Sequence, residues 1–201
     1  MGLGTTTWML RNTPHMIRTK EVANELGLHN PTILDYGPGG MVWFLADYLP
    51  KNDRTQWTEY LRLKNNLLKF TDSVLRKTGL FSLETSEPKE IADLLQGLSP
   101  KQIYVLDKEE RVIDAVKRIS ERNKLNTKII PYLIDIDNEE FEQNIGDIVI
   151  AYNVVQRTKN PEKTLERIAK TTRIGGILSV NIPYAPEGFR EVREEVYYRL
   201  H

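Results

Sequence analysis

Short runs of apolar residues alternate along the chain with longer segments in which apolar residues recur at helical spacing. Each short run predicts a buried strand, and these runs are 32–36, 102–106, 128–134, 147–152 and 176–182. Each longer segment predicts a helix, and these segments are 15–28, 41–49, 55–77, 88–98, 109–123, 161–172 and 187–200. Strands that alternate with helices pair in parallel through right-handed crossovers. The pattern therefore predicts an α/β fold with an open, mostly parallel sheet of about five strands flanked by helices.

A glycine-rich turn ends the first predicted strand, within the segment Ile-Leu-Asp-Tyr-Gly-Pro-Gly-Gly at 33–40. Glycine lets the backbone approach a ligand closely and take a positive φ. The start of the helix that follows presents free N–H groups. The turn therefore predicts a ligand-binding crevice at the carboxyl end of the first strand. The alternative is a turn with a purely structural role.

Three positions narrow the choice of ligand. Asp35 lies two residues before Gly37, where dinucleotide-binding loops usually carry an apolar or small residue, and Val42 stands where the motif G-x-G-x-x-G requires glycine. Both observations disfavour a nicotinamide-dependent oxidoreductase. Asp107 ends the next strand, where a carboxylate can accept hydrogen bonds from both hydroxyls of a ribose. Asp also suits the N-cap of the helix that follows, so both roles stay open for Asp107.

Taken in order, these and later motifs resemble those of the class I (Rossmann-like) S-adenosylmethionine-dependent methyltransferases. The matching segments are the glycine turn at 33–40, the acidic residue Asp107, the segment 134–136, the fourth-strand segment 146–155 and the Gly-Gly turn with the fifth strand at 172–182. The resemblance covers about residues 31–49 and 88–185. It implies S-adenosyl-L-methionine as cofactor and a sheet with the strand order 3-2-1-4-5.

The resemblance also implies roles for individual residues. Asp35 is expected near the amino group of the cofactor's methionine, Asp107 at the ribose and Asp135 at the adenine. The implied cofactor-binding residues are Asp35, Gly37, Gly39, Asp107, Lys108, Asp135, Ile136 and Asn153. Tyr152 and Asn153 follow the fourth strand and are the candidate catalytic residues. The alternative for both is an ordinary polar loop at the end of a strand.

The chain departs from the family pattern in several places. Met41 replaces the third glycine of the first motif. The distance from Gly39 to Asp107 far exceeds the roughly 20 residues of an ordinary βαβ unit, so residues 50–87 are predicted to form a helical insertion or lid. The chain also leaves little room for the family's usual sixth and seventh strands. We expect one domain over 1–201, with an N-terminal arm and helix at its start, over residues 1–30.

A second motif, at residues 181–184, gives weaker evidence about function. The segment Asn181-Ile-Pro-Tyr is similar to the Asn-Pro-Pro-Tyr motif of methyltransferases that act on amino groups of adenine or glutamine. In that family the motif ends the fourth strand, whereas here it ends the predicted fifth strand. We therefore interpret it as a coincidence.

Charge and composition disfavour other classes of function. The chain has 28 basic and 28 acidic residues, whereas a dedicated nucleic-acid binder usually has a basic excess. Residues 51–77 are locally basic and contain aromatic residues, which could suit a nucleic acid. The favoured interpretation of this segment is an amphipathic lid helix with a solvated basic face.

The absence of cysteine excludes disulfides and zinc–thiolate sites. The three histidines lie far apart in the sequence, so no metal site is predicted. No segment approaches the roughly 20 apolar residues of a membrane-spanning helix, and no signal peptide is evident. We expect a cytoplasmic protein.

The leading hypothesis is a methyltransferase that moves a methyl group to a small-molecule or protein acceptor, mainly by alignment and desolvation. One alternative is a catalytically silent subunit with the same fold, and another is the disfavoured nicotinamide-dependent oxidoreductase. The apolar face of the 50–87 insertion is expected either to cap the substrate pocket or to form a homodimer contact.

Overall fold

The computed structural model describes residue 15 and residues 17–37, 98–122 and 127–201. The predicted N-terminal arm and the insertion at 50–87 lie outside these described residues, as do the three helices predicted between 41 and 98 apart from Leu98. Among the described residues, no helix is both long enough and apolar enough to cross a membrane.

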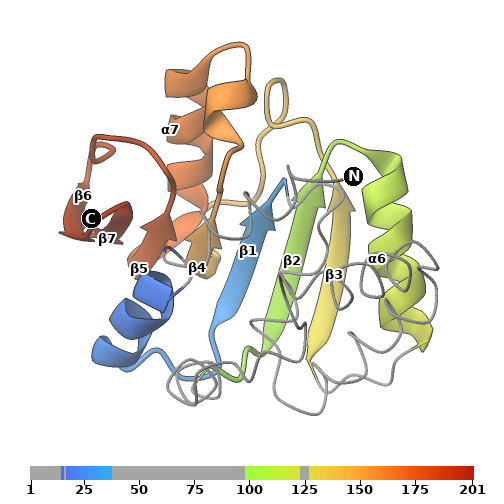
Figure 1. Ribbon diagram of the computed structural model, residues 1–201, viewed down its shortest axis with the longest axis horizontal. Helices are drawn as coiled ribbons and strands as arrows, with labels where there is room; N and C mark the ends of the chain where they lie inside the picture. Colours follow the sequence, from blue (N-terminus) through green and yellow to red (C-terminus); the bar gives the residue numbers. More distant parts are fainter. Residues whose placement is uncertain (1–14, 16, 38–97, 123–126) are drawn as a thin grey trace, which may run out of the picture.

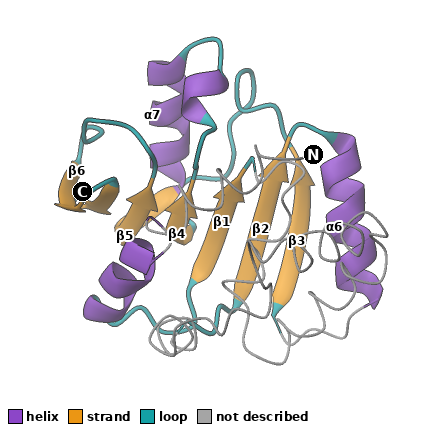
Figure 2. Cartoon of the chain, viewed as in Figure 1, coloured by secondary structure: helices purple, strands orange, loops and turns teal. Residues whose placement is uncertain are grey.

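A seven-stranded sheet forms the centre of the described chain, in the order β3-β2-β1-β4-β5-β7-β6 (Figures 1 and 2). The strands are β1 Thr32–Tyr36, β2 Gln102–Asp107, β3 Lys128–Leu133, β4 Gly146–Ile150, β5 Thr172–Ser179, β6 Phe189–Arg193 and β7 Val196–Arg199. The strands β1 to β5 pair in parallel. This arrangement confirms the predicted α/β class and the predicted order 3-2-1-4-5.

The C-terminal part of the sheet differs from the prediction. The helix predicted over 187–200 is wrong, because β6 and β7 form an antiparallel hairpin there and β7 pairs with β5. The dense charges of this segment favour a helix by intrinsic propensity. Val196 and Tyr197 become almost completely buried when β7 joins the sheet, and such burial outweighs the propensity. The hairpin also supplies the two strands for which the sequence seemed to leave little room.

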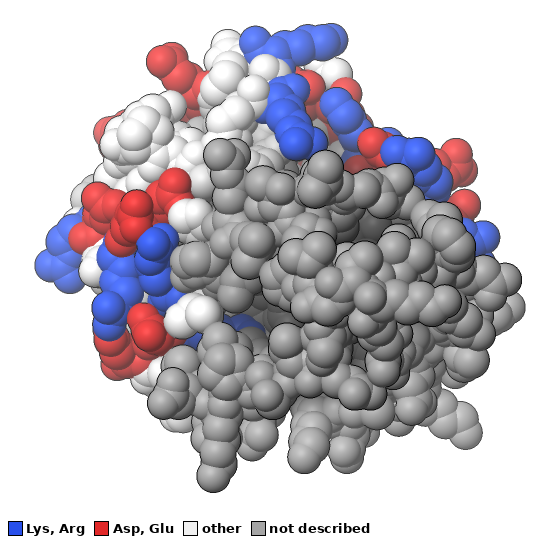
Figure 3. All heavy atoms as spheres, in the orientation of Figure 1, with Lys and Arg blue, Asp and Glu red and all other residues white. Residues whose placement is uncertain are grey.

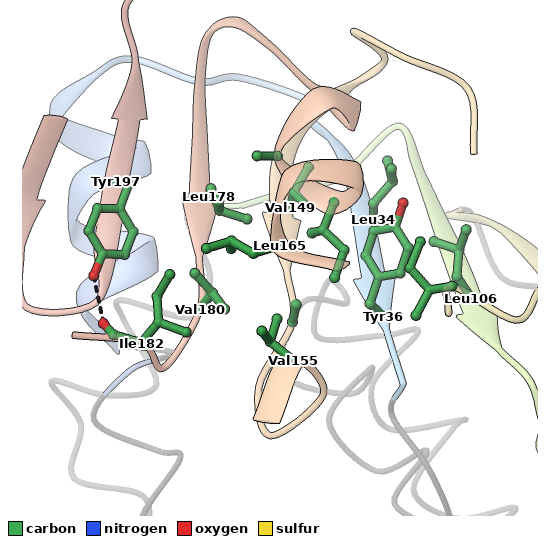
Figure 4. Packing of buried hydrophobic residues seen from close by; sticks show 14 of the residues in the cluster. Leu34, Tyr36, Leu106, Val149, Val155, Leu165, Leu178, Val180, Ile182 and Tyr197 are labelled. Carbon is green, nitrogen blue, oxygen red and sulfur yellow. Dashed lines mark hydrogen bonds between the residues drawn. The ribbon is translucent and has the colours of Figure 1, made fainter. Parts of the chain in front are cut away.

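Helices cover both faces of the sheet. They are the helical segment 17–25, α6 Glu110–Arg122, the short 3-10 helix η2 Val155–Arg157 and α7 Pro161–Thr171. Because side chains alternate between the two faces of a strand, each face has its own core. Val22 of the first helix and Val112 of α6 belong to one core. Leu165 of α7 belongs to the other, which Figure 4 shows from close by.

Local contacts define both ends of α7. The Asn160 side chain accepts a hydrogen bond from the Lys163 N–H at 3.1 Å, and Pro161 occupies the first turn, where its missing N–H costs nothing. At the other end, Arg199 of β7 donates to the Lys170 carbonyl at 3.3 Å. A cation beside the last carbonyls of a helix is favourable. The C-terminal hairpin therefore helps to hold α7 in place.

Ion pairs tie the N-terminal helix to the turn between β6 and β7. The pairs are Arg18–Glu194, Arg193–Glu21 and Arg193–Glu25, and the His15 ring also contacts the Glu195 carboxylate. Such pairs near the surface are individually weak. Together they join two segments from opposite parts of the sequence, and they place the helix over the strands at this side of the sheet.

Candidate functional site

The carboxyl ends of β1, β2 and β3 meet beside the turn at Gly37. The Gly37 N–H donates a hydrogen bond to the Leu106 carbonyl at 2.7 Å, and the Ile134 N–H donates to the Asp107 carbonyl at 3.0 Å. These two bonds hold the segments that follow β1 and β3 against the end of β2. Open α/β sheets bind their ligands at this edge.

Two carboxylates lie at this edge, on neighbouring strands. Asp35 of β1 and Asp107 of β2 are each only 6% exposed. Burial, and to a smaller extent the charge of Asp107, raises the pKa of Asp35 from its ordinary value of 3.8 to about 7. Among the described residues, none donates a hydrogen bond to the Asp35 carboxylate. A buried carboxylate with an acidic neighbour favours a cationic or hydrogen-bond-donating ligand.

Asp107 has a local role that the sequence also allowed. Its Oδ1 accepts a hydrogen bond from the Glu109 N–H at 2.9 Å, immediately before α6. The carboxylate thus helps to start this helix. The two oxygens of a carboxylate together offer about four acceptor sites. The cap occupies one of these sites, so the cap by itself does not exclude the ribose role.

The turn at Gly37 lies against the loop that follows β4. Gly37 has a φ of 60°, and a Cβ atom added to it would come within 2.6 Å of Cγ2 of Val154. Only glycine accepts both this conformation and this contact without strain. The contact places the neighbouring Asn153 close to the glycine turn. Gly39, the other predicted glycine, lies outside the described residues.

The loop after β3 contains the residues expected near the adenine. Asp135 closes its own turn, because its carboxylate accepts hydrogen bonds from the Asp137 N–H at 3.2 Å and from Asn138 Nδ2 at 2.7 Å. The Ile136 side chain is 8% exposed and packs into the core beside α7. Lys108 is largely exposed, and its Nζ lies 3.9 Å from a carboxylate oxygen of Asp137.

Arg167 of α7 supports this loop, and the sequence did not single it out. Its Nη1 donates to the carbonyls of Ile136 at 2.8 Å and Asp137 at 2.6 Å. The Asp137 carboxylate accepts in turn from the Lys159 N–H at 3.0 Å. These contacts hold the loop after β3 on the face of the sheet that α7 covers.

The candidate catalytic residue Tyr152 is enclosed by other hydroxyl groups. Its hydroxyl lies 2.5 Å from Ser179 Oγ and 3.0 Å from Thr19 Oγ1, and these two oxygens are 2.6 Å apart. Burial raises the pKa of the Tyr152 hydroxyl above its ordinary range. Tyr152 therefore works here as a neutral hydrogen-bonding group that joins the N-terminal helix to the sheet. Thr19 and Ser179 carry no signal in the sequence that would have revealed this cluster.

Asn153 and Asn181 form a reciprocal pair at the ends of β4 and β5. The Asn153 N–H donates to Asn181 Oδ1 at 2.8 Å, and Asn181 Nδ2 donates to Asn153 Oδ1 at 2.9 Å. Asn153 has a φ of 56°, which asparagine tolerates better than most residues. The side chain of Asn181 thus replaces a strand partner at the point where the chain turns away from β4.

A separate groove lies on the side of the sheet that α7 covers. It has a volume of about 400 Å³ and runs between α7 and residues 184–189, with Leu165 and Phe189 among its lining residues. None of the predicted site residues lines it. The carboxylate site and this groove are therefore distinct features of the described chain.

Comparison with protein families gives one match within the chain. Residues 88–180 match the family described as a methyltransferase domain. A comparison with the curated proteins gives no significant match.

Many solved structures are similar to the chain at low sequence identity. An S-adenosyl-L-methionine-dependent methyltransferase from Methanococcus maripaludis has 15% identity and a TM-score of 0.43, over 83% of this chain and 54% of that one. A complex of the Haloferax volcanii Trm112 methyltransferase activator with a methyltransferase has 17% identity and a TM-score of 0.42, over 92% of this chain and 59% of that one. A methyltransferase from Aquifex aeolicus has 13% identity and a TM-score of 0.44, over 87% of this chain and 72% of that one. The chain thus spans about half the length of the first of these structures.

The family match covers β2 to β5 and the helices between them. The sheet places β1 between β2 and β4, in agreement with the order 3-2-1-4-5 expected from the sequence. Residues 88–180 thus match the methyltransferase-domain family, and the strand order of the sheet agrees with the order that the resemblance implied.

Proposed function

We propose that the chain is an S-adenosylmethionine-dependent methyltransferase that binds its cofactor at the carboxyl ends of β1, β2 and β3. The observation that carries this proposal is the pair of buried carboxylates, Asp35 and Asp107, beside the turn at Gly37. S-adenosylmethionine offers a matching set of groups, with an ammonium, two ribose hydroxyls and an adenine amino group. A buried acidic pair is costly to the free protein, and a ligand with these donors would offset the cost.

Each of these residues has a defined task in the proposal. Asp35 accepts hydrogen bonds from the ammonium of the methionine part, and Asp107 accepts from the ribose hydroxyls. Gly37 allows the backbone to approach the ligand. Asp135 accepts from the adenine amino group, on the loop that Arg167 holds in place.

When bound, the cofactor supplies a methyl group on a sulfonium that is ready for displacement. The chain's own contribution is to orient the cofactor and to exclude water from the reacting groups. Asn153 lies next to the glycine turn and is our candidate for the side of the site that meets the acceptor. The enclosed hydroxyl of Tyr152 favours a supporting role for that residue.

The acceptor in this proposal is a small molecule or a protein side chain. On the face shown in Figure 3, basic side chains of the described residues are interspersed with acidic ones, which supports this choice over a nucleic acid. The lid and the homodimer contact proposed for 50–87 lie outside the described residues. We retain the cytoplasm as the proposed location on the sequence grounds given above.

Calorimetry with three ligands tests the proposal. We expect the full chain to bind S-adenosylmethionine and S-adenosylhomocysteine, and to give no response to NAD. Binding of NAD without binding of either adenosyl ligand would refute the proposal. A methyl-transfer assay with labelled cofactor and a broad cell extract then separates an enzyme from a silent subunit, because only an enzyme would label an acceptor.

Substitution of Asp107 separates its two roles. Asp107→Ala removes the helix cap and the proposed ribose contact, so we expect unfolding to become easier by about 0.5–2 kcal/mol. We also expect S-adenosylhomocysteine binding to weaken by about 1–3 kcal/mol. Asp107→Asn keeps an oxygen for the Glu109 N–H and should lose affinity with little loss of stability. Denaturant unfolding and calorimetry measure both effects, and an unchanged affinity in both variants would contradict the ribose assignment.

A further inference from the structure

Strand β3 forms one edge of the sheet, beside β2 (Figures 1 and 2). Successive residues of a strand direct their main-chain groups to opposite sides, so every second residue of β3 bonds β2. The Ile134 N–H donates to the Asp107 carbonyl at the end of β2. By alternation, the main-chain groups of Tyr132 also face β2, and those of Pro131 and Leu133 face away from the sheet.

Pro131 gives this edge an excess of hydrogen-bond acceptors. Proline has no N–H, and it fits a strand where that group would point away from the sheet. The carbonyls of Pro131 and Leu133 both face outward, but only Leu133 adds an outward N–H. The missing donor discourages pairing with a long foreign strand, whereas a short segment that is rich in donors matches the edge.

Large apolar side chains are exposed at the same end of β3. Tyr132 is 46% exposed and Leu133 is 51% exposed. The Tyr132 ring packs edge-on against Phe141, with 4.9 Å between the ring centroids, and Phe141 also contacts Tyr104 at 5.6 Å. Tyr132 is therefore held by an aromatic neighbour while nearly half of its surface stays open. Exposed apolar surface next to polar residues is typical of a protein interaction site.

The loop that carries Phe141 is strongly acidic. Residues 135–142 contain five acidic residues and no basic one. One of the five, Asp137, pairs with a lysine, whereas Glu140 and Glu142 are exposed on either side of Phe141. These two carboxylates put negative charge beside the exposed aromatic surface, so a cationic partner is complementary to it. Arg and Lys offer only donors, and their charged groups can also lie over the face of an aromatic ring.

The same charges argue against other occupants of this surface. A second copy of the chain, docked through the same edge, would bring the two acidic loops together, and like charges repel. Nucleic acids and anionic membranes are repelled for the same reason. The charge therefore favours a basic protein segment.

We propose that this surface docks a short basic segment of a partner protein. We call it the β3 edge patch, and it consists of Pro131, Tyr132, Leu133, Glu140 and Glu142. The segment lies along β3 and bonds the outward main-chain groups, while its Arg or Lys side chains pair with the two glutamates and cover the Tyr132 ring. The proposal does not depend on the proposed function, because it uses no residue of the cofactor site.

Two synthetic peptides of matched length test the proposal on the full chain. In one, Arg and Lys alternate with Val and Leu, and in its twin Glu replaces every Arg and Lys. Fluorescence anisotropy of the labelled peptides measures binding at physiological ionic strength. We expect the basic peptide to bind at least about ten-fold more tightly than its acidic twin. Equal binding of the two peptides, or no binding of the basic one, would overturn the proposal.

A matched pair of charge reversals locates the binding. Glu140→Lys combined with Glu142→Lys should weaken the basic peptide by about ten-fold or more. Glu162→Lys combined with Glu187→Lys is the control, because it makes the same change in net charge at exposed residues that line the groove beside α7. The control should stay within about two-fold of the wild type, apart from the general effect of net charge. Equal losses in both double variants would show attraction to the whole protein, and not docking at β3.

Two further measurements separate docking along the edge from simple charge attraction. Tyr132→Ser should weaken the basic peptide several-fold, on the scale of a cation–aromatic contact, and urea unfolding checks that this variant is folded. If it is not, Leu133→Ser takes its place and should show a similar loss. Amide hydrogen exchange read by NMR should show that the bound peptide protects the Leu133 N–H. Full affinity in the folded variant, or an unprotected Leu133 N–H in the complex, would refute the proposal.

Discussion

Asp35→Asn is expected to make the ligand-free protein more stable at alkaline pH, while it weakens cofactor binding. The folded protein holds the pKa of Asp35 at about 7, mainly by burial, against an ordinary value of 3.8. Between these two values the folded state binds more protons than the unfolded state, so the free energy of unfolding falls as pH rises. The stability that Asp35 contributes is complete below about pH 4 and is lost by about pH 7.

The asparagine cannot ionise, so it avoids this loss. We expect Asp35→Asn to be more stable by about 1.5 kcal/mol at pH 5, where the unfolded wild type is already largely ionised, and by on the order of 4 kcal/mol at pH 8.5. Urea unfolding at both pH values measures the difference. Glu142→Gln is the control, since it removes an exposed carboxylate and should change neither curve. A gain at pH 5 as large as that at pH 8.5 would contradict the raised pKa.

The wild type is less stable than Asp35→Asn without ligand at alkaline pH, but it should bind the ligand more tightly. An ammonium favours the ionised form of Asp35, so the affinity of the wild type for S-adenosylhomocysteine is expected to rise as pH increases through about 7. Asp35→Asn should bind at least about ten-fold more weakly at pH 8 and should lack this dependence on pH. This would be a case in which binding requires a charge that destabilises the empty fold.

Gly37→Ala is the second substitution with a large expected effect. The new Cβ meets two costs, a positive φ and a contact of 2.6 Å with Val154 Cγ2. A left-handed conformation costs an alanine about 1–2 kcal/mol, and overpacking adds about 1–3 kcal/mol. We therefore expect the free energy of unfolding to fall by roughly 2–5 kcal/mol, as measured by urea unfolding.

Two variants separate these costs. Gly27 has a φ of 65° with no atom within 4 Å of an added Cβ, so Gly27→Ala should show the cost of the conformation alone. In Gly37→Ala with Val154→Ala, the clashing methyl groups are gone and the remaining Cβ contact is 3.7 Å. This double variant should regain the part of the free energy of unfolding that Gly37→Ala loses to overpacking. If the loss in the free energy of unfolding of the double variant equals the sum of the losses of Gly37→Ala and Val154→Ala, the turn does not lie against Val154.

The sequence was sufficient to predict the parallel strands, because each is a short apolar run between helical segments. It also predicted their order, through motifs that recur in one family. The hairpin of β6 and β7 could not be predicted in this way. Its alternating Arg and Glu residues suit a helix by propensity, and the burial of Tyr197 depends on pairing with β5, which no local pattern encodes.

The same distinction applies to the site. Asp35, Gly37 and Asp107 lie at the ends of strands, so the sequence could single them out from position and residue type. The partners of Tyr152 and Asn153 could not be found in that way. Thr19 is 133 residues from Tyr152 and Asn181 is 28 residues from Asn153. These contacts exist only because distant segments become neighbours in the sheet.

The link between the N-terminal helix and the C-terminal hairpin also bears on how the chain is made. Arg193 pairs with Glu25 across 168 residues, and Thr19 bonds Ser179 across 160. The helix is therefore synthesised long before its partners leave the ribosome. Until then the apolar side chains of Val22 and Ala23, buried in the finished fold, stay exposed on the nascent chain. Contacts this distant in sequence form slowly, so the N-terminal helix is expected to stay without its core partners until the C-terminal hairpin has been made.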